Sequence, residues 1–312
     1  MLQSILLLLA GLVVLIGCGE FLVRGASCIA LKARISPMVV GLTIVAFGTS
    51  APELIISIQA ALKGSPDIAT GNVIGSNICN LSLILGVTAL IRPVLVQRAT
   101  LVIDWPVAFG SVLLFWLFSI DQQLVWWEGI IFIILLCIYV VYSIRSSRKK
   151  TLIEQSGELP TAHSKTAWKD PLFIVLGGIG LYFGSEWFVG GAKIIAMNLG
   201  IEERIIGLTV VAVGTSLPEL VASGVSAFRS HTDMAIGNLM GSNIFNILSI
   251  MGITSIVTTV SISDLILTND FTWMAGITVF VLPLMIIKKD VSRMDGLLLL
   301  LFYAIYVMVV FW

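Results

Sequence analysis

Two glutamates stand inside long apolar stretches of this 312-residue chain, each at the end of nearly the same six-residue string. GTSAPE ends at Glu53, and GTSLPE ends at Glu219. A charge near the centre of a bilayer costs about 2.5–3.5 kcal/mol on insertion scales. Because neither string contains a lysine or an arginine, each carboxylate must be protonated or neutralised by a mobile cation.

Further oxygen donors accompany each carboxylate. A proline inside a helix removes a backbone hydrogen bond and clashes with the carbonyl four residues back. Pro52 is therefore predicted to free carbonyl groups around Ala46, Phe47 and Gly48, and Pro218 to free those around Ala212, Val213 and Gly214. In lipid such carbonyls must face protein or a water-filled cavity, where they are good ligands for hard cations. Hydroxyl groups lie one helical turn from the glutamates, on Thr49, Ser50, Thr215 and Ser216.

A second repeated string, GNVIGSNICN at 71–80 and GNLMGSNIFN at 237–246, supplies amides and more hydroxyls. Residues spaced by four share one face of a helix, so each copy predicts a polar stripe. We expect part of each stripe to bind ions, namely Ser76, Asn80, Ser242 and Asn246. The other amides are expected to form interhelical hydrogen bonds, namely Asn72, Asn77, Asn238 and Asn243.

The candidate ligands are thus carboxylate, hydroxyl, amide and backbone oxygens. All-oxygen sites suit Ca²⁺, Mg²⁺ and Na⁺ and do not suit Zn²⁺ or Cu²⁺. Two carboxylates balance one Ca²⁺ and would equally hold two or more Na⁺. Competition between one divalent and several monovalent ions for the same pair of glutamates is the physical basis of an exchanger.

Composition places these strings in a membrane protein. The chain is 58% hydrophobic and 12% charged, whereas soluble domains usually carry about 25% charged residues. Stretches of about 20 apolar residues, long enough to span a bilayer, predict an all-α protein with ten transmembrane helices. They lie at 2–23, 37–62, 69–91, 100–120, 125–146, 171–196, 203–228, 235–260, 269–287 and 293–312.

The chain is internally duplicated. Residues 39–87 align without a gap with residues 205–253, and 24 of these 49 positions are identical. The interpretation is a first repeat over 1–146 (transmembrane helices 1–5, motif 39–87) and a second over 171–312 (helices 6–10, motif 205–253). A polar cytoplasmic linker joins them over 147–170.

An odd number of spans in each repeat makes the second copy enter the membrane upside down. If both termini lie outside, 15 of the 18 Lys and Arg residues fall in cytoplasmic loops, as the positive-inside rule requires. Inverted five-helix repeats are a transporter architecture, with the site where the repeats meet. We expect a multi-pass protein of the plasma (inner) membrane, with the central loop cytoplasmic.

The two motif pairs resemble the α-repeats of the Na⁺/Ca²⁺ exchangers, within the cation/Ca²⁺ exchanger superfamily. The resemblance implies a central Ca²⁺ site formed by Thr49, Glu53, Thr215 and Glu219. It implies flanking Na⁺ sites that use the Ala46 and Ala212 carbonyls with Ser50, Ser76, Ser216 and Ser242. Asn80 and Asn246 match the remaining central polar positions, and the long first and sixth helices are implied to slide across the other eight.

Some relatives carry Asp where this chain has Asn246, and that Asp accompanies K⁺ dependence in one branch. Its absence argues against K⁺ co-transport, and two glutamates holding three Na⁺ would carry about +1. The short central loop leaves no room for the Ca²⁺-sensing domains of animal plasma-membrane exchangers, so a compact prokaryotic type is expected.

The hypothesis is electrogenic, K⁺-independent antiport of Na⁺ and Ca²⁺ by alternating access. H⁺/Ca²⁺ exchange on the same fold and K⁺-dependent exchange stay open, and a cation channel and an intramembrane enzyme are the other classes considered. No cofactor, no nucleic acid and no protein partner is implied, so we expect a monomer whose partners are Ca²⁺, Na⁺ and the lipid bilayer.

Overall fold

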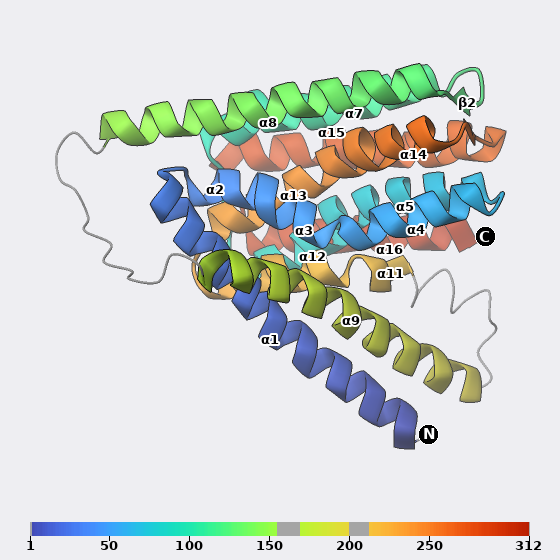
Figure 1. The fold of residues 1–312 in the computed structure, drawn as a ribbon, viewed down its shortest axis with the longest axis horizontal. Coiled ribbons are helices and arrows are strands. Elements are labelled where there is room, and N and C mark those ends of the chain that lie inside the picture. The colour runs from blue at the N-terminus through green and yellow to red at the C-terminus, as the bar shows by residue number, and fades with distance from the viewer. Residues whose placement is uncertain (1, 155–168, 200–211, 312) are drawn as a thin grey trace.

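The computed structural model describes residues 2–154, 169–199 and 212–311, and almost all of them are helical (Figure 1). Within these ranges seven helices are long and apolar enough to cross a membrane, or eight if a bent pair over Pro37–Thr49 and Ala51–Leu62 is one span. The seven are Leu2–Ala33, Pro66–Ile91, Thr100–Phe118, Trp126–Lys149, Lys169–Asn198, Thr232–Val257 and Ile266–Lys288. The expected total of ten stays a prediction, because part of the expected span at 203–228 lies outside the described residues.

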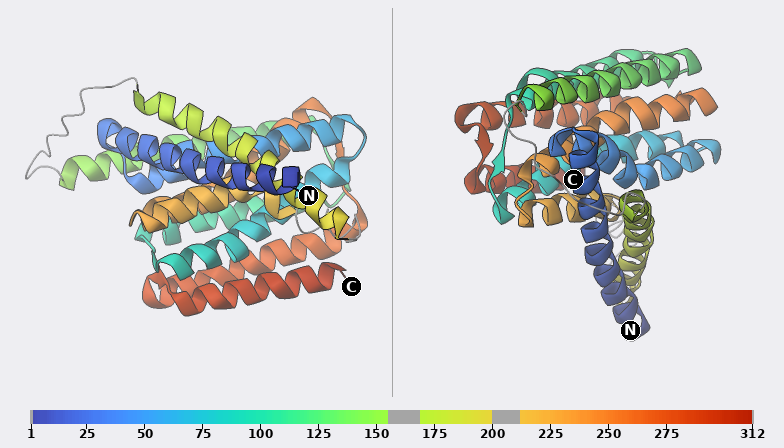
Figure 2. Two further views of the ribbon diagram at one scale, coloured as in Figure 1. Left: turned by 90° about the horizontal axis from the view of Figure 1, so that it is seen from below. Right: turned by 60° about the vertical axis from the view of Figure 1, so that its left-hand side comes forward.

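Helices α1 (Leu2–Ala33) and α9 (Lys169–Asn198) pack tightly against each other along their length. Gly11 allows this close approach, because a Cβ there would lie 2.7 Å from the carbonyl oxygen of Gly184. Gly25 of α1 faces Asp170, so the residue numbers rise along one helix as they fall along the other, and the pair is antiparallel. In Figures 1 and 2 the pair projects at an angle from the remaining helices.

Secondary-structure boundaries repeat along the chain at a spacing of 166 residues. Both ends of α3 (Ala46–Thr49), α4 (Ala51–Leu62) and α5 (Pro66–Cys79) recur in α11 (Ala212–Thr215), α12 (Leu217–Phe228) and α13 (Thr232–Phe245). Short π-helical segments also recur at this spacing, except that η5 ends one residue later than its counterpart η2. They are η2 (Asn80–Ile84) with η5 (Asn246–Met251), and η3 (Thr100–Asp104) with η6 (Ile266–Asp270).

The remaining described elements complete the two halves. In the first half they are α2 (Pro37–Val40), η1 (Gly41–Val45), α6 (Leu85–Ile91), α7 (Trp105–Phe118) and α8 (Trp126–Glu154). In the second half they are α14 (Gly252–Val257), α15 (Phe271–Lys288) and α16 (Arg293–Phe311). Helix α8 therefore continues beyond the expected end at residue 146. The rest of the expected linker, residues 155–168, lies outside the described residues.

Two short antiparallel ribbons join the halves. Strand β1 (Val94–Leu95) pairs with β4 (Asp290–Val291), and β2 (Gln123–Leu124) pairs with β3 (Val260–Ser261). Each ribbon takes one strand from each half, so the loops of one half satisfy the backbone hydrogen bonds of the other. The hydropathy pattern of the sequence did not predict these ribbons, because each strand has only two residues.

The spans that begin with α5 and α13 form the centre of the molecule. The most apolar window of Thr232–Val257 is 83% buried and that of Pro66–Ile91 is 72% buried, against 22% for the first helix. These two spans carry the GNxxGSN strings. Close packing at this centre depends on Gly237, where a Cβ would overlap the carbonyl oxygen of Met38.

We predict that Gly237→Ala destabilises the protein although alanine favours helix. The new methyl group must displace the α2 backbone, and such overpacking costs about 1–3 kcal/mol. The matched control is Gly110→Ala in α7, where a Cβ meets no described atom within 4 Å and the substitution should stabilise by about 0.5–1 kcal/mol. Thermal unfolding in detergent measures both variants, and equal midpoints would contradict the packing argument.

Candidate cation site

Each repeated string bends its helix at the serine before the proline. Ser50 separates α3 from α4 with φ −86° and ψ 3°, and Ser216 separates α11 from α12 with φ −91° and ψ 9°. The axis turns by 43° at the first break. Pro52 and Pro218 therefore lie in the first turn of a new helix, where a missing N–H costs nothing.

This placement corrects one expectation about the backbone. The Ala46 carbonyl is not freed, because it accepts hydrogen bonds from the Ser50 amide at 2.9 Å and from the Thr49 hydroxyl at 3.3 Å. The proline removes the donor that would have reached the carbonyl of Gly48, four residues back. Ala212 opens α11 at the edge of the described residues.

Glu53 and Glu219 are both 1% exposed, in the first turns of α4 and α12. An acidic group is favoured there by the helix dipole, but this supplies only part of a full counter-charge. The two carboxyl groups lie close enough to interact electrostatically. Ser50 donates a hydrogen bond to Glu219 Oε1 at 3.0 Å, so the first string reaches across to the second.

Among the described residues, no cationic side chain forms an ion pair with Glu53 or Glu219. The ion pairs found there join Lys32 to Asp170 and Arg229 to Glu20. The described side chains that contact the two carboxylates are therefore uncharged. Beside them Ser216 donates to Ser76 at 3.4 Å, which places hydroxyl groups of both halves next to each other.

Several buried oxygen atoms in this region have no hydrogen-bond partner. We call these atoms the central oxygen cluster: both carboxylate oxygens of Glu53, Oε2 of Glu219, Oδ1 of Asn80, Oδ1 of Asn246 and Oγ of Ser242. Leaving a buried polar atom unsatisfied costs about 1–3 kcal/mol, and more if it is charged. All of them belong to residues that the sequence selected as ion ligands. Most of these atoms are acceptors, and a hard cation is a partner that suits such a set of oxygens.

Two further asparagines hold the amides of the cluster in place. Asn80 Nδ2 donates to Asn243 Oδ1 at 3.2 Å, and Asn246 Nδ2 donates to Asn77 Oδ1 at 3.0 Å. Asn77 also donates to the backbone carbonyl of Asn243 at 3.2 Å. The bonds donated by Asn80 and Asn246 use the nitrogen of a cluster amide and leave its oxygen free. Asn77 and Asn243 thus make the interhelical contacts expected of them.

Two serines take part that the sequence interpretation did not select. Asn72 donates to Ser57 Oγ at 3.1 Å, and Asn238 donates to Ser223 Oγ at 3.0 Å. Thr49 in turn donates to Asn238 Oδ1 at 3.4 Å. A signal was present, because Ser57 and Ser223 are identical in the repeat and follow Glu53 and Glu219 by four residues.

Contacts between the halves connect several of the predicted site residues, among them Ser50, Ser76, Ser216 and Glu219. The burial of the threonines differs between the halves. Thr49 is fully buried, whereas Thr215 is half-buried. Ser50, Ser76, Ser216 and Ser242 are all buried at 4% exposure or less. The donor set contains two carboxylates and a group of neutral oxygens, which is the chemistry of hard cations.

Comparison with known proteins agrees with this chemistry. A family profile described as sodium/calcium exchanger protein matches residues 3–145 and 169–312. The chain is 38% identical to the protein CaxA of Alkalimonas amylolytica, over 98% of both chains. It is 32% identical to the sodium/calcium exchanger MaX1 of Methanosarcina acetivorans, over 99% of both. A solved structure of the sodium-calcium exchanger NCX_Mj superposes with a TM-score of 0.84 at 30% identity, covering 99% of each chain.

The match to the family profile covers both halves of the chain, and the structural match covers nearly all of it. The chain is a membrane transporter of compact prokaryotic type, not an enzyme, and it belongs to the sodium/calcium exchanger protein family.

Proposed function

We propose that this protein is a secondary antiporter that exchanges Na⁺ for Ca²⁺ by alternating access, electrogenically and without K⁺. The observation that carries the proposal is the central oxygen cluster, in which two carboxylates from two repeated strings are buried together and receive no counter-charge from the described residues. Only ions that enter and leave can neutralise such a pair in turn. The exchanger relatives support the same reading.

The ligands follow from the positions of the oxygens. Ca²⁺ would lie between Glu53 and Glu219, with the Thr49 and Thr215 oxygens completing its shell. Na⁺ would occupy flanking positions against the hydroxyls of Ser50, Ser76, Ser216 and Ser242, with the Asn80 and Asn246 oxygens between them. The Ala46 and Ala212 carbonyls would contribute to Na⁺, and Ala46 has the least support because its carbonyl already accepts two hydrogen bonds.

The membrane arrangement belongs to the proposal. Ten spans in two inverted repeats, over 1–146 and 171–312, would place both termini outside the plasma (inner) membrane and the central linker in the cytoplasm. The antiparallel packing of α1 and α9, which occupy equivalent places in the repeats, supports this inversion. The pair would slide against the rest to expose the cluster to either side. One chain supplies every proposed ligand, which supports a monomer.

Replacing either glutamate tests the site. We predict that Glu53→Gln or Glu219→Gln lowers Na⁺-driven ⁴⁵Ca²⁺ uptake into proteoliposomes by about 30-fold or more, because removing one charge from a buried set costs about 2–5 kcal/mol. The matched control is Glu186→Gln on the exposed face of α9, which should transport normally. Full activity in either cluster variant would refute the assignment.

Exchange for protons is the second candidate, since a buried carboxylate can also be neutralised by H⁺. The hydroxyls around the glutamates favour Na⁺, because protons need no such cage. We predict that an outward Na⁺ gradient drives ⁴⁵Ca²⁺ uptake and that a pH gradient without Na⁺ does not. Uptake driven by the pH gradient alone would move the assignment to H⁺/Ca²⁺ exchange.

Charge movement tests the stoichiometric class. If about three Na⁺ leave for each Ca²⁺ that enters, consistent with two glutamates shared by both ion types, one positive charge leaves the vesicle per cycle. The interior then becomes negative in a sealed vesicle and opposes further cycles. With equal K⁺ on both sides, valinomycin should therefore accelerate Ca²⁺ uptake. A rate unchanged by valinomycin indicates electroneutral exchange, and a rate that requires K⁺ itself indicates K⁺ co-transport.

A further inference from the structure

A second buried acid lies outside the central oxygen cluster. Asp104, the last residue of η3, is 3% exposed. Its Oδ1 accepts a hydrogen bond from the Tyr139 hydroxyl of α8 at 2.8 Å, and its buried Oδ2 has no partner. An ionisable residue inside a membrane span is costly and usually has a function. Helix capping does not explain Asp104, because its side chain makes no cap hydrogen bond at the start of α7.

Asp104 lines a polar cavity of about 200 Å³ between η3, α2, α8 and the start of α13. Asp233 of α13 lines the same cavity, with hydroxyl groups from four serines, Ser36, Ser143, Ser146 and Ser147. No lysine or arginine is among its described lining residues. The volume exceeds that of one water, about 30 Å³ in the liquid, so the cavity can hold an ion with some of its hydration.

The lining is graded from an open rim to a closed floor. Ser146 at the rim is exposed and Asp233 is half-buried, whereas Asp104 and Ser143 at the floor are buried. The Ser143 hydroxyl, like Oδ2 of Asp104, has no hydrogen-bond partner. Asp233 already accepts the Met234 amide at 3.0 Å, so it keeps one carboxylate oxygen. The buried Oδ2 of Asp104, which has no hydrogen-bond partner, thus points to a missing partner at the floor.

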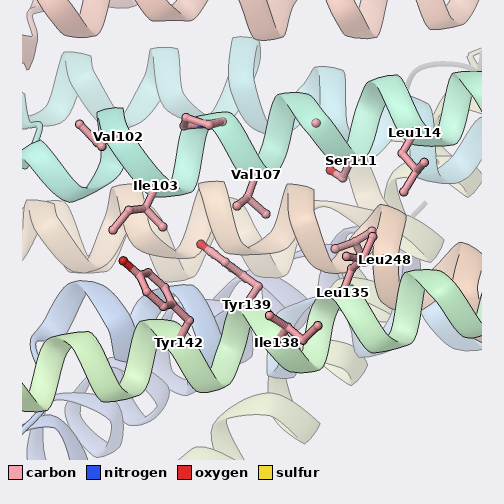
Figure 3. A pocket seen from close by; sticks show the side chains of 12 residues that line it. Val102, Ile103, Val107, Ser111, Leu114, Leu135, Ile138, Tyr139, Tyr142 and Leu248 are labelled. Atoms are coloured by element: carbon pink, nitrogen blue, oxygen red, sulfur yellow. The ribbon is translucent and has the colours of Figure 1, made fainter.

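The neighbouring groove differs in kind. Figure 3 shows Tyr139 and Ile103 among the side chains that line a cavity of about 520 Å³ between α7 and α8. Its other labelled side chains are mostly aliphatic, as expected for a surface that faces acyl chains. Ile103 lines both cavities, so it separates the apolar groove from the polar one. The unpartnered oxygens belong to the polar cavity.

We propose that this polar cavity is a second cation site, distinct from the exchange site, which binds a hard cation between Asp104 and Asp233. Two carboxylates and serine hydroxyls form an all-oxygen set, and their charge matches one Ca²⁺. Na⁺ has the same ligand chemistry and is the alternative occupant. The site lies beside α2, whose helix leads directly into the bend at Ser50, so occupancy would brace the helix that carries Glu53.

Equilibrium binding of ⁴⁵Ca²⁺ to the full-length protein in Na⁺-free detergent solution tests the proposal. Wild type should bind about two Ca²⁺ and Asp104→Asn about one, because a site of two carboxylates loses half its charge. The matched control is Asp270→Asn, at the position 166 residues further on, whose oxygens are not among the unpartnered buried atoms. It should bind as wild type does. The same variants are tested for ²²Na⁺ binding. If Asp104→Asn loses bound Na⁺ but keeps both Ca²⁺, Na⁺ is the occupant of the second site.

The double variant Glu53→Gln/Glu219→Gln separates this proposal from the proposed function. It should keep the Asp104-dependent ion and lose the other. If it binds as wild type does, the exchange-site assignment fails and the second site stands. If Asp104→Asn elutes as an aggregate, Asp233→Asn and Ser143→Ala replace it. These substitutions should disturb folding less, because Asp233 is only half-buried and the Ser143 hydroxyl makes no hydrogen bond. Unchanged binding of both ions in folded variants would mean that the cavity holds water only, and the proposal would be wrong.

Discussion

Two acidic groups buried near each other, in a region where the described residues supply no counter-charge, are the constraint on which this structure depends. Like charges repel more strongly in a protein interior than in water, because the effective dielectric constant there is lower. A fixed lysine or arginine would remove that cost permanently, but it would also remove the site. The described chain instead surrounds Glu53 and Glu219 with neutral oxygens. Neutral oxygens would help to coordinate a cation, but they carry no charge and so would not neutralise the carboxylates themselves.

The polar groups around the carboxylates are of two kinds. Some offer free oxygens to the site, and others accept hydrogen bonds that orient the first kind. Asn77 and Asn243 use their own hydrogen bonds to fix the nitrogen ends of Asn246 and Asn80. Ser57 and Ser223 do the same for Asn72 and Asn238 one turn away. Free oxygens therefore point inward without a rearrangement of the amides when an ion arrives. A cluster built this way can release its ion, because the surrounding bonds persist when it is empty.

The sequence revealed the parts whose residue types are costly in lipid. Two glutamates in a 166-residue repeat predicted the site, because nothing else in an apolar span justifies them. The same reasoning misplaced Pro52, since a proline in a first turn and one in a helix interior look alike until the break at Ser50 is known. It also missed the two ribbons, whose two-residue strands leave no periodic pattern. Asp104 was hidden because its partner Tyr139 lies 35 residues away on another helix.

The two halves share a sequence but not a set of contacts. Ser50 of the first half bonds Glu219 of the second, whereas its counterpart Ser216 bonds Ser76 and leaves Glu53 without a partner. Nearly identical strings in non-identical surroundings are what the proposed inverted repeat would give if the molecule rests in one of two end states. If the halves exchanged conformations, Ser216 would bond Glu53 and Ser50 would bond Ser242. Under the proposed alternation the asymmetry would have a cause in the duplication itself, because each half contains the residues for both arrangements and the bound ions would decide which one is occupied.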